Sequence, residues 1–237
     1  MCYASILILD RPVWYLFFVK FVRETVTTPR KQGRPKSEEK YLLVLNAASH
    51  LFLHDGFSKT SMDTVAKASG VSKQTVYSHF DSKDALFQAA ITSKCRSYQL
   101  DAEQLIDITD GTLSLYEGLK KVGVQFVRLI QDQEAVAMFR VIIAEAVNNT
   151  HVAKLFYEAG PLASVTTLSE VVEQCGAGKL TSEQAHELAL DFCALLKSEL
   201  HTMMLCGIRK PMTESEIELH VTKAAKKTCL LFDYYLQ

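Results

Sequence analysis

Apolar residues recur every three or four positions along most of this chain, a spacing that places them on one face of an α-helix. The first such segment follows Ser37, whose hydroxyl can cap a helix. Glu38 and Glu39 suit the first turn, because negative charge is favourable at a helix N-terminus. Gly56 predicts the end of this helix, since glycine commonly follows the last helical residues. The apolar positions between these ends are Tyr41, Val44, Leu45, Ala48, Leu51 and Phe52.

Two shorter helices joined by a tight turn are predicted next. Ser61 precedes a helix that ends at Gly70, and Ser72 precedes a second helix over residues 73–80. Val71 is the single apolar residue in the turn between them. Small residues at the end of the first helix and in the turn allow the two helices to cross closely.

The rest of the chain is also helical in pattern. One helix is expected to begin at Lys83, and five more follow residue 110. Gly160-Pro161 is expected to kink or divide the third of these five. No segment keeps the period-two alternation of a strand, so the predicted fold is all-α. The expected ranges of the five helices are roughly 112–131, 134–148, 151–175, 181–206 and 213–236.

The charge of the chain is unevenly distributed along its length. The formal net charge is -1, but residues 30–83 hold nine Lys/Arg against five Asp/Glu, while residues 84–237 hold 14 against 20. A local basic segment on an acidic body is typical of a module that faces phosphates. Chance fluctuation is the alternative. The chain divides into an N-terminal extension and arm (1–37), a small helical domain (38–98) and a larger helical domain (99–237).

The six cysteines give no sign of a metal site or a disulfide framework. None forms a C-x-x-C pair, and none has histidines at zinc-finger spacing. We therefore expect reduced thiols in a cytoplasmic protein, with no metal and no cofactor. A redox-sensing cysteine is the alternative, although no neighbouring charge marks an activated thiolate.

The first 22 residues are unusually apolar. Asp10, Arg11 and Pro12 interrupt the run and leave residues 13–19, which are too few to span a bilayer. A signal peptide would need a basic start and a small-residue cleavage site, and neither is clear. We expect an over-extended start or a dispensable extension, and membrane association is not expected. A membrane tether is the alternative.

The segment from Thr60 to Lys83 carries the main functional signal. Two short helices with a glycine-containing turn form a helix-turn-helix, whose second helix can enter the major groove of DNA. The predicted outer face of that helix offers short or flexible polar groups, which suit base edges and phosphates. These residues are Lys73, Gln74, Thr75, Tyr77, Ser78 and His79. Tyr77 and His79 have an alternative reading, as part of the small domain's core or its rim.

This segment resembles the signature of the TetR/AcrR family of transcriptional regulators, and the resemblance covers residues 38–98. Two later segments, at 139–146 and 155–161, are similar to the ligand domain of the AefR-like regulators. The matching positions of the signature are Thr60, Ser61, Val65, Ala66, Ser69, Gly70, Val71, Ser72, Val76, Tyr77, His79, Phe80, Ser82, Lys83 and Leu86.

The resemblance implies roles at a double-stranded DNA operator. Phosphate contacts are expected from Thr60, Ser61, Tyr77 and Lys83, with His79 near the backbone and Ser72 at the start of the recognition helix. Base contacts are expected from Lys73, Gln74 and Thr75. Gln74 departs from the glycine common in the family, so no particular operator is implied. A solvated charge is the alternative for Lys83.

The basic arm is a second candidate DNA contact. Arg30 to Pro35 reads RKQGRP, which resembles the Arg-Gly-Arg-Pro core that follows narrow minor grooves. Arg34 is expected to insert there, because A·T-rich grooves concentrate negative potential. The alternative is a solvated basic linker.

The larger domain offers candidates for binding an unknown small-molecule effector. Glu145 lies on an otherwise apolar helix face and needs a partner there. The alternative for Glu145 is an interhelical ion pair or a helix edge, and ordinary core packing is the alternative for the apolar residues. The candidate ligand-binding residues are Phe126, Phe139, Glu145, Phe156, Phe192 and Met203.

The last two predicted helices are expected to form a homodimer. Each carries an apolar stripe, and two such helices from each subunit would make a four-helix interface. The alternative is that both stripes are hidden inside one subunit. The stripe residues are Leu188, Phe192, Leu195, Leu196, Ile217, Val221, Ala224, Ala225 and Thr228.

Together these patterns indicate a sequence-specific DNA-binding regulator, a ligand-responsive repressor that binds a palindromic operator as a dimer. An α-helical enzyme is the main alternative from another class. The chain has no Gly-rich phosphate loop, no G-x-S-x-G and no H-E-x-x-H, and we assign no catalytic residue. A divergent regulator that acts through protein partners, or at a membrane through residues 1–22, is the third possibility.

Overall fold

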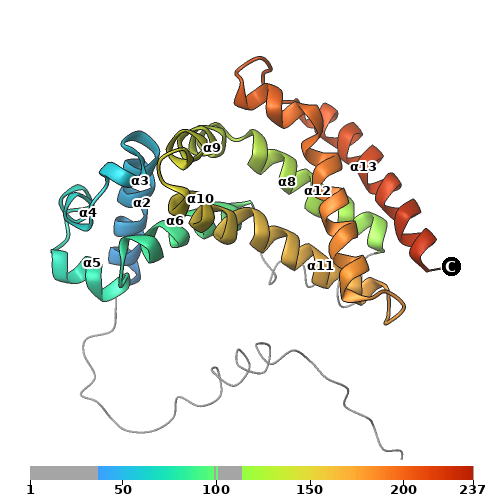
Figure 1. The fold of residues 1–237 in the computed structure, drawn as a ribbon, viewed down its shortest axis with the longest axis horizontal. Helices are drawn as coiled ribbons and strands as arrows, with labels where there is room; N and C mark the ends of the chain where they lie inside the picture. The colour runs from blue at the N-terminus through green and yellow to red at the C-terminus, as the bar shows by residue number, and fades with distance from the viewer. Residues whose placement is uncertain (1–36, 99, 101–113, 237) are drawn as a thin grey trace, which may run out of the picture. The chain divides into compact units, whose positions relative to one another are not determined.

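The computed structural model describes residues 37–98, 100 and 114–236, and within them every regular element is helical (Figure 1). The all-α expectation is confirmed. The predicted N-terminal extension and arm, with Arg34, lie outside the described residues. The elements are α2 (Glu38–His54), α3 (Gly56–Lys59), α4 (Met62–Ser69), α5 (Lys73–His79), α6 (Lys83–Ser97), α8 (Leu115–Gln131), α9 (Gln133–Ala146), α10 (Thr150–Tyr157), the π-helical turn η2 (Glu158–Leu162), α11 (Ala163–Cys175), α12 (Ser182–Leu205) and α13 (Glu214–Tyr235).

Local capping explains why the helix ends follow the sequence so closely. Ser37 and Ser72 accept hydrogen bonds from backbone amides in the first turns of α2 and α5. Ser61 and Thr64 form a capping box at the start of α4, and Gly70 ends that helix with a φ of 71°. Pro161 lies in η2, so the single helix predicted over 151–175 is divided there.

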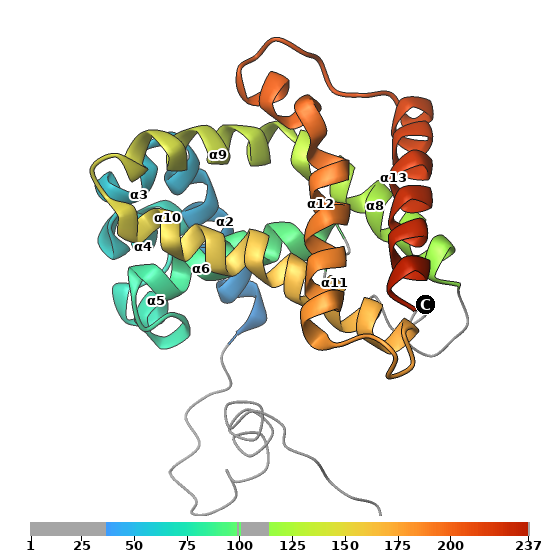
Figure 2. The same ribbon diagram turned by 45° about the vertical axis from the view of Figure 1, so that its right-hand side comes forward.

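One hydrophobic core joins the first helices to the middle of the chain. Phe52, Phe57 and Phe87 pack ring against ring, with centroids 5.1–5.8 Å apart. Ile142 of α9 and Val152 of α10 belong to the same buried cluster. In Figure 2, α9 and α10 lie beside α2, α3 and α6. The small domain therefore shares its core with α9 and α10 rather than closing upon itself.

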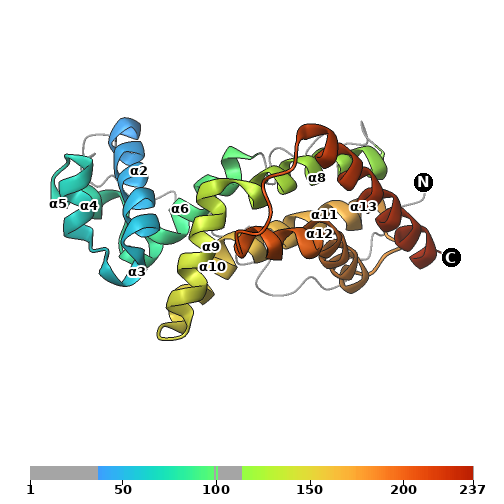
Figure 3. The ribbon, with the colours of Figure 1, turned by 90° about the horizontal axis from the view of Figure 1, so that it is seen from above.

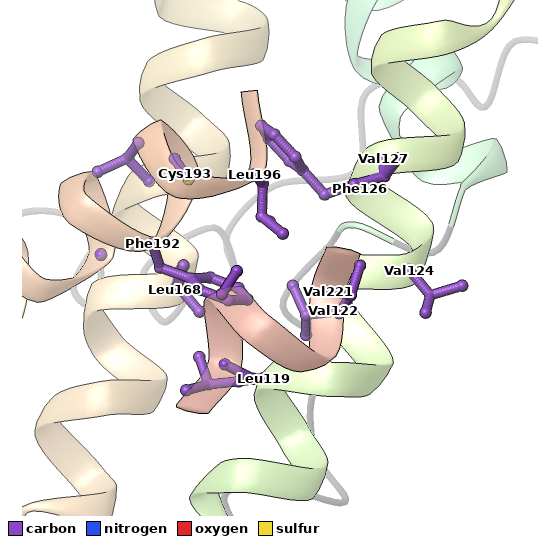
Figure 4. Close-up of a cluster of buried hydrophobic side chains, with 14 of the residues drawn as sticks. Leu119, Val122, Val124, Phe126, Val127, Leu168, Phe192, Cys193, Leu196 and Val221 are labelled. Carbon is purple, nitrogen blue, oxygen red and sulfur yellow. The ribbon is translucent and has the colours of Figure 1, made fainter. Parts of the chain in front are cut away.

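A second core holds α8, α11, α12 and α13 together. Phe192 and Leu196 of α12 meet Leu168 of α11 and Val221 of α13 (Figure 4). Gly123 in α8 permits this approach, because a Cβ atom there would lie 2.6 Å from Val221 Cγ1. Figure 3 shows this bundle at the end of the described unit opposite α4 and α5.

The residues of the predicted dimer stripes lie inside this second core, where they pack within one subunit, and the homodimer itself stays a prediction. The structure supports the alternative, in which one subunit hides both stripes, because α12 and α13 pack upon each other and upon α8. Leu195 is only partly buried. The stripe residues with at most 3% exposure are Leu188, Phe192, Leu196, Ile217, Val221, Ala224, Ala225 and Thr228.

Within residues 37–98 and 114–236, no helix combines the length and the apolar character needed to cross a bilayer. The same residues contain no cluster of three or more side chains suited to hold a metal ion.

Candidate nucleic-acid interface

The helix-turn-helix places the polar face of α5 on the surface. Val65 of α4 and Val76 of α5 are fully buried, which fixes the crossing of the two short helices. The opposite face of α5 is exposed at Ser72, Lys73, Gln74, Tyr77 and Ser78 and partly exposed at Thr75 and His79. The structure therefore brings most of the predicted DNA contacts onto one accessible face.

Lys73 is held by an acidic neighbour at this face. Its Nζ lies 2.7 Å from Oδ1 of Asp63 in α4, and both side chains are more than half exposed. The hydrogen bond and charge of Asp63 raise the pKa of Lys73, so the amine stays cationic. An exposed pair of this kind contributes little to stability, so a base or phosphate can displace Asp63 at little cost.

The side chains of Thr60, which is buried, and Lys83, which is partly exposed, are bonded to nearby backbone carbonyls. Thr60 is 3% exposed, and its hydroxyl donates to the Gly56 carbonyl at 2.8 Å. Lys83 Nζ donates to the carbonyls of Phe57 at 2.9 Å and Thr60 at 3.1 Å. It also lies 4.1 Å from the centroid of the Phe57 ring. As placed, these groups bond within the corner between α3 and α4, and the phosphate contacts expected of both residues stay a prediction.

His79 and Ser61 lie at the two borders of the face. The His79 ring packs edge-on against Tyr41 of α2, with centroids 5.9 Å apart. Its orientation is therefore set by the core rim as well as by α5. Ser61 is exposed, although its hydroxyl is bonded within the capping box of α4.

A cavity of about 400 Å³ lies behind the helix-turn-helix. Three of the predicted ligand-binding residues line it: Phe126, Phe139 and Phe156. Phe139 and Phe156 meet edge to face, with centroids 4.8 Å apart. Helices α8, α9, α10, α11 and α12 all contribute residues to its lining. A largely apolar hollow of this volume is typical of a small-molecule site.

Both α2 and α6 contribute walls to this cavity, which the sequence did not reveal. Ser49, His50 and His54 come from α2, and Lys94 and Cys95 come from α6. The polar residues of α2 follow a helical spacing, but that pattern looks the same whether the face meets solvent or a cavity. The helices that flank the helix-turn-helix, α2 and α6, therefore also form part of the cavity wall.

The other three predicted ligand residues lie away from the cavity lining. Phe192 is fully buried in the second core, and Met203 is not part of the lining. Glu145 accepts hydrogen bonds from the Ser58 amide at 3.3 Å and the Ser58 hydroxyl at 3.0 Å. The carboxylate thus links α9 to α3, as a helix-edge contact, rather than facing a ligand.

Family comparisons match both halves of the chain. Residues 44–90 match the bacterial regulatory proteins of the tetR family, and residues 117–230 match the C-terminal domain of AefR-like transcriptional repressors. The regulator UidR of Escherichia coli K12 is 46% identical over 48 residues, which span 20% of this chain and only 24% of UidR.

Solved structures extend the likeness over most of the chain. The flavonoid-responsive regulator FrrA is 33% identical, with a TM-score of 0.61, over 82% of this chain and 97% of FrrA. A TetR-family regulator from Mesorhizobium loti has a TM-score of 0.66 at 20% identity, over 84% of this chain and 98% of that one, and supports the fold alone.

Proposed function

This chain belongs to the TetR family of bacterial regulatory proteins, and from that premise we propose that it is a ligand-responsive repressor of transcription. In this proposal it binds a palindromic operator as a dimer, in the cytoplasm, and releases the operator when a small molecule enters the cavity. It performs no catalysis.

One observation supports the proposed ligand response: the cavity wall is formed partly by helices that pack against the proposed DNA-binding face. Helix α6 begins at Lys83, beside the helix-turn-helix, and lines the cavity through Ile91 and Lys94. Helix α2 packs against α4 and also lines the cavity. A ligand that fits one arrangement of α2 and α6 better than another shifts the population toward it, and so changes DNA affinity.

The contact between Glu145 and Ser58 offers a second connection. Ser58 lies in α3, directly before α4, while Glu145 lies near the end of α9, whose residues Met138 and Phe139 line the cavity. Movement of α9 would therefore pull on the segment that precedes α4. Gly56 leaves space for this carboxylate, since a side chain there would overlap it.

The proposed DNA interface is the exposed face of α5 with its neighbours. Lys73, Gln74 and Thr75 are assigned to base edges, and Ser61, Ser72, Tyr77 and His79 to the backbone. A good bidentate base contact discriminates by about 1–3 kcal/mol. Arg34 is assigned to the adjacent minor groove. We leave Thr60 and Lys83 out of this interface because their side chains are bonded internally.

The proposed dimer uses the outer faces of α12 and α13. Leu190, Leu219, Leu230 and Tyr234 are large apolar residues that are 43–71% exposed on these faces. A two-fold pairing would cover them and form a four-helix interface. It would also set two copies of α5 about one turn of DNA apart.

The proposed effector is a small molecule with an aromatic or otherwise apolar body. Three phenylalanines line the cavity, and aromatic walls pack well against flat rings. FrrA, which is similar over most of its length, is described as flavonoid-responsive. We propose residues 38–98 as the DNA-binding domain and 99–237 as the effector and dimer domain.

An electrophoretic shift on the DNA upstream of this chain's own gene tests the proposal. Gln74→Ala and Tyr77→Ala should each weaken binding about five- to 100-fold, the range that corresponds to roughly 1–3 kcal/mol. Lys210→Ala, which changes an exposed residue between α12 and α13, serves as the control and should bind like the wild type. Unchanged binding by both α5 variants would refute the assigned face.

A further inference from the structure

We propose that the cavity selects small organic acids, with Lys197 of α12 binding the anionic group and the phenylalanine walls holding an apolar body. This inference rests on the proposed role of the cavity as the effector site and adds the charge class of the ligand.

The charged side chains of the cavity wall leave one cation without a partner. Lys94 Nζ lies 2.8 Å from Glu134 Oε2 and 2.9 Å from Asp132 Oδ1, so these charges are satisfied. Among the described residues, Lys197 has no ion pair and no hydrogen bond, and its Nζ lies 6.0 Å from the centroid of the Phe126 ring. Lys197 is therefore an ammonium group of the wall that no carboxylate of the described residues pairs with, and such a group favours an anion.

A neutral histidine lies one turn beyond Lys197. His201 is 8% exposed and meets Phe139, a cavity residue, edge to face with centroids 5.0 Å apart. Burial lowers its pKa, and the charge of Lys197 lowers it further, so His201 does not add a second cation near neutral pH. Its ring approaches the Ile130 backbone, but neither nitrogen makes a hydrogen bond of good geometry within the described residues.

The backbone of α12 departs from helical geometry between these two residues. Ser198 has a φ of 42° and a ψ of -153°, a conformation that non-glycine residues rarely adopt. His220 of α13 supports the same turn, with its Nε2 2.9 Å from the Leu196 carbonyl. Since a carbonyl only accepts, that nitrogen carries the proton. The kink therefore lies directly after Lys197, and Figure 4 shows Leu196 and Cys193 of the same helix near Phe126.

The other residues of the cavity lining indicate the size and the apolar character of the ligand. Leu129, Met138 and Phe156 add apolar surface, and a volume of about 400 Å³ accommodates a molecule of two or three fused or linked rings. Ser49 and Asn46 of α2 add neutral polar groups to the lining. An apolar acid would therefore place its charge at α12 and its body between α8, α9 and α10.

Two fluorescent probes that share one aromatic frame test the charge preference. 8-Anilinonaphthalene-1-sulfonate is anionic, and N-phenyl-1-naphthylamine lacks the sulfonate. Each is titrated into wild type, Lys197→Met, Lys197→Arg and the control Lys210→Met. Isothermal titration confirms a stoichiometry of one probe per subunit, and circular dichroism confirms that each variant is folded.

Lys197→Met should weaken the anionic probe about tenfold and leave the neutral probe within twofold, while Lys197→Arg retains the anionic probe. Lys210→Met should behave like the wild type. Equal binding of the anionic probe by Lys197→Met and wild type would overturn the inference, as would an equal loss of both probes.

A DNA shift with the same probes separates this inference from the proposed function. If the anionic probe binds through Lys197 and the protein then releases DNA, both the anion site and the proposed ligand response are supported. If it binds through Lys197 but DNA binding is unchanged, the anion site stands and the ligand response fails. If wild type binds no DNA, the repressor proposal fails, while the probe titration still decides the anion site.

Discussion

Two groups of three phenylalanines differ in how completely side chains fill the space around them. On the side of α2–α6, Phe52, Phe57 and Phe87 interlock in a filled core that fixes short, well-capped helices. On the side of α8–α12, Phe126, Phe139 and Phe156 surround an open volume of about 400 Å³. The same residue type therefore fills a core in one place and borders a cavity in the other. The proposed regulation needs both: a DNA-binding face that keeps its shape, and a neighbouring cavity whose shape depends on a bound ligand.

The largest expected difference in stability comes from truncating one phenylalanine of the filled core and one phenylalanine of the cavity wall. Phe87→Ala should cost about 3–5 kcal/mol of unfolding free energy, because it empties a fully buried site. Phe139→Ala should cost about 1–2 kcal/mol, because Phe139 already borders open space and is only partly buried. Urea denaturation followed by circular dichroism measures both. Equal losses would show that the two sites are equally packed.

The close approach in the second core gives the next effect. Gly123→Ala would place a Cβ 2.6 Å from Val221 Cγ1 and 3.1 Å from Phe192 Cζ. Overpacking should lower the free energy of unfolding by about 1–3 kcal/mol. The higher helix propensity of alanine offsets part of this loss. Thermal unfolding should show a lower Tm. The double variant Gly123→Ala with Val221→Ala should recover part of the loss, and no recovery would argue against the contact.

A substitution on the proposed DNA-binding face is expected to increase DNA affinity. Asp63→Asn should free Lys73 and remove a negative charge near the phosphates, which tightens DNA binding about threefold. Fluorescence anisotropy at two salt concentrations measures it, with Glu170→Gln on α11 as the matched charge control. Weaker binding by Asp63→Asn would mean that Asp63 positions Lys73 for DNA rather than competing with it.

The smallest effect concerns pH and the junction between α8 and α9. Burial opposes the charged form of Asp132, but hydrogen bonds from Lys94, the Ala135 amide and Tyr98 hold its pKa below the ordinary value. A depressed pKa contributes stability above the unfolded-state value of about 3.9, and that stability is lost as pH falls through the folded value. The partly exposed site limits the effect to about 1 kcal/mol or less.

Unfolding of wild type and Asp132→Asn between pH 7 and pH 3 checks this sign. The variant should be slightly less stable at pH 7, and the difference should shrink toward pH 3. A difference that grows in acid would contradict the assignment.

Helix ends and the exposed face of α5 were predictable because their causes are local. Ser61, Gly70 and Ser72 act within a few residues of themselves, so capping and turn chemistry are legible in the sequence. Which surface covers an apolar stripe, by contrast, depends on residues that are distant in the sequence. Helical periodicity showed that Leu188 and Val221 are buried, but it did not show whether another helix of the same subunit or a partner covers them.

The same limit explains what the sequence did not show at the candidate sites. Glu145 was correctly identified as needing a partner, but that partner, Ser58, lies 87 positions away along the chain. Lys83 fits the signature of a phosphate contact, yet folding brings the Phe57 carbonyl within 2.9 Å of its amine. The α2 wall of the cavity appears only when α2, α9 and α12 are brought together.

Methylation-protection footprinting of the operator tests the central claim most directly. If α5 reads DNA from a symmetric dimer, the wild type should protect two major-groove patches on one face of the duplex, centred about 10 base pairs apart. Gln74→Ala should lose protection in both patches together. A single protected patch, or a footprint that is the same with Gln74→Ala and Tyr77→Ala, would contradict the account.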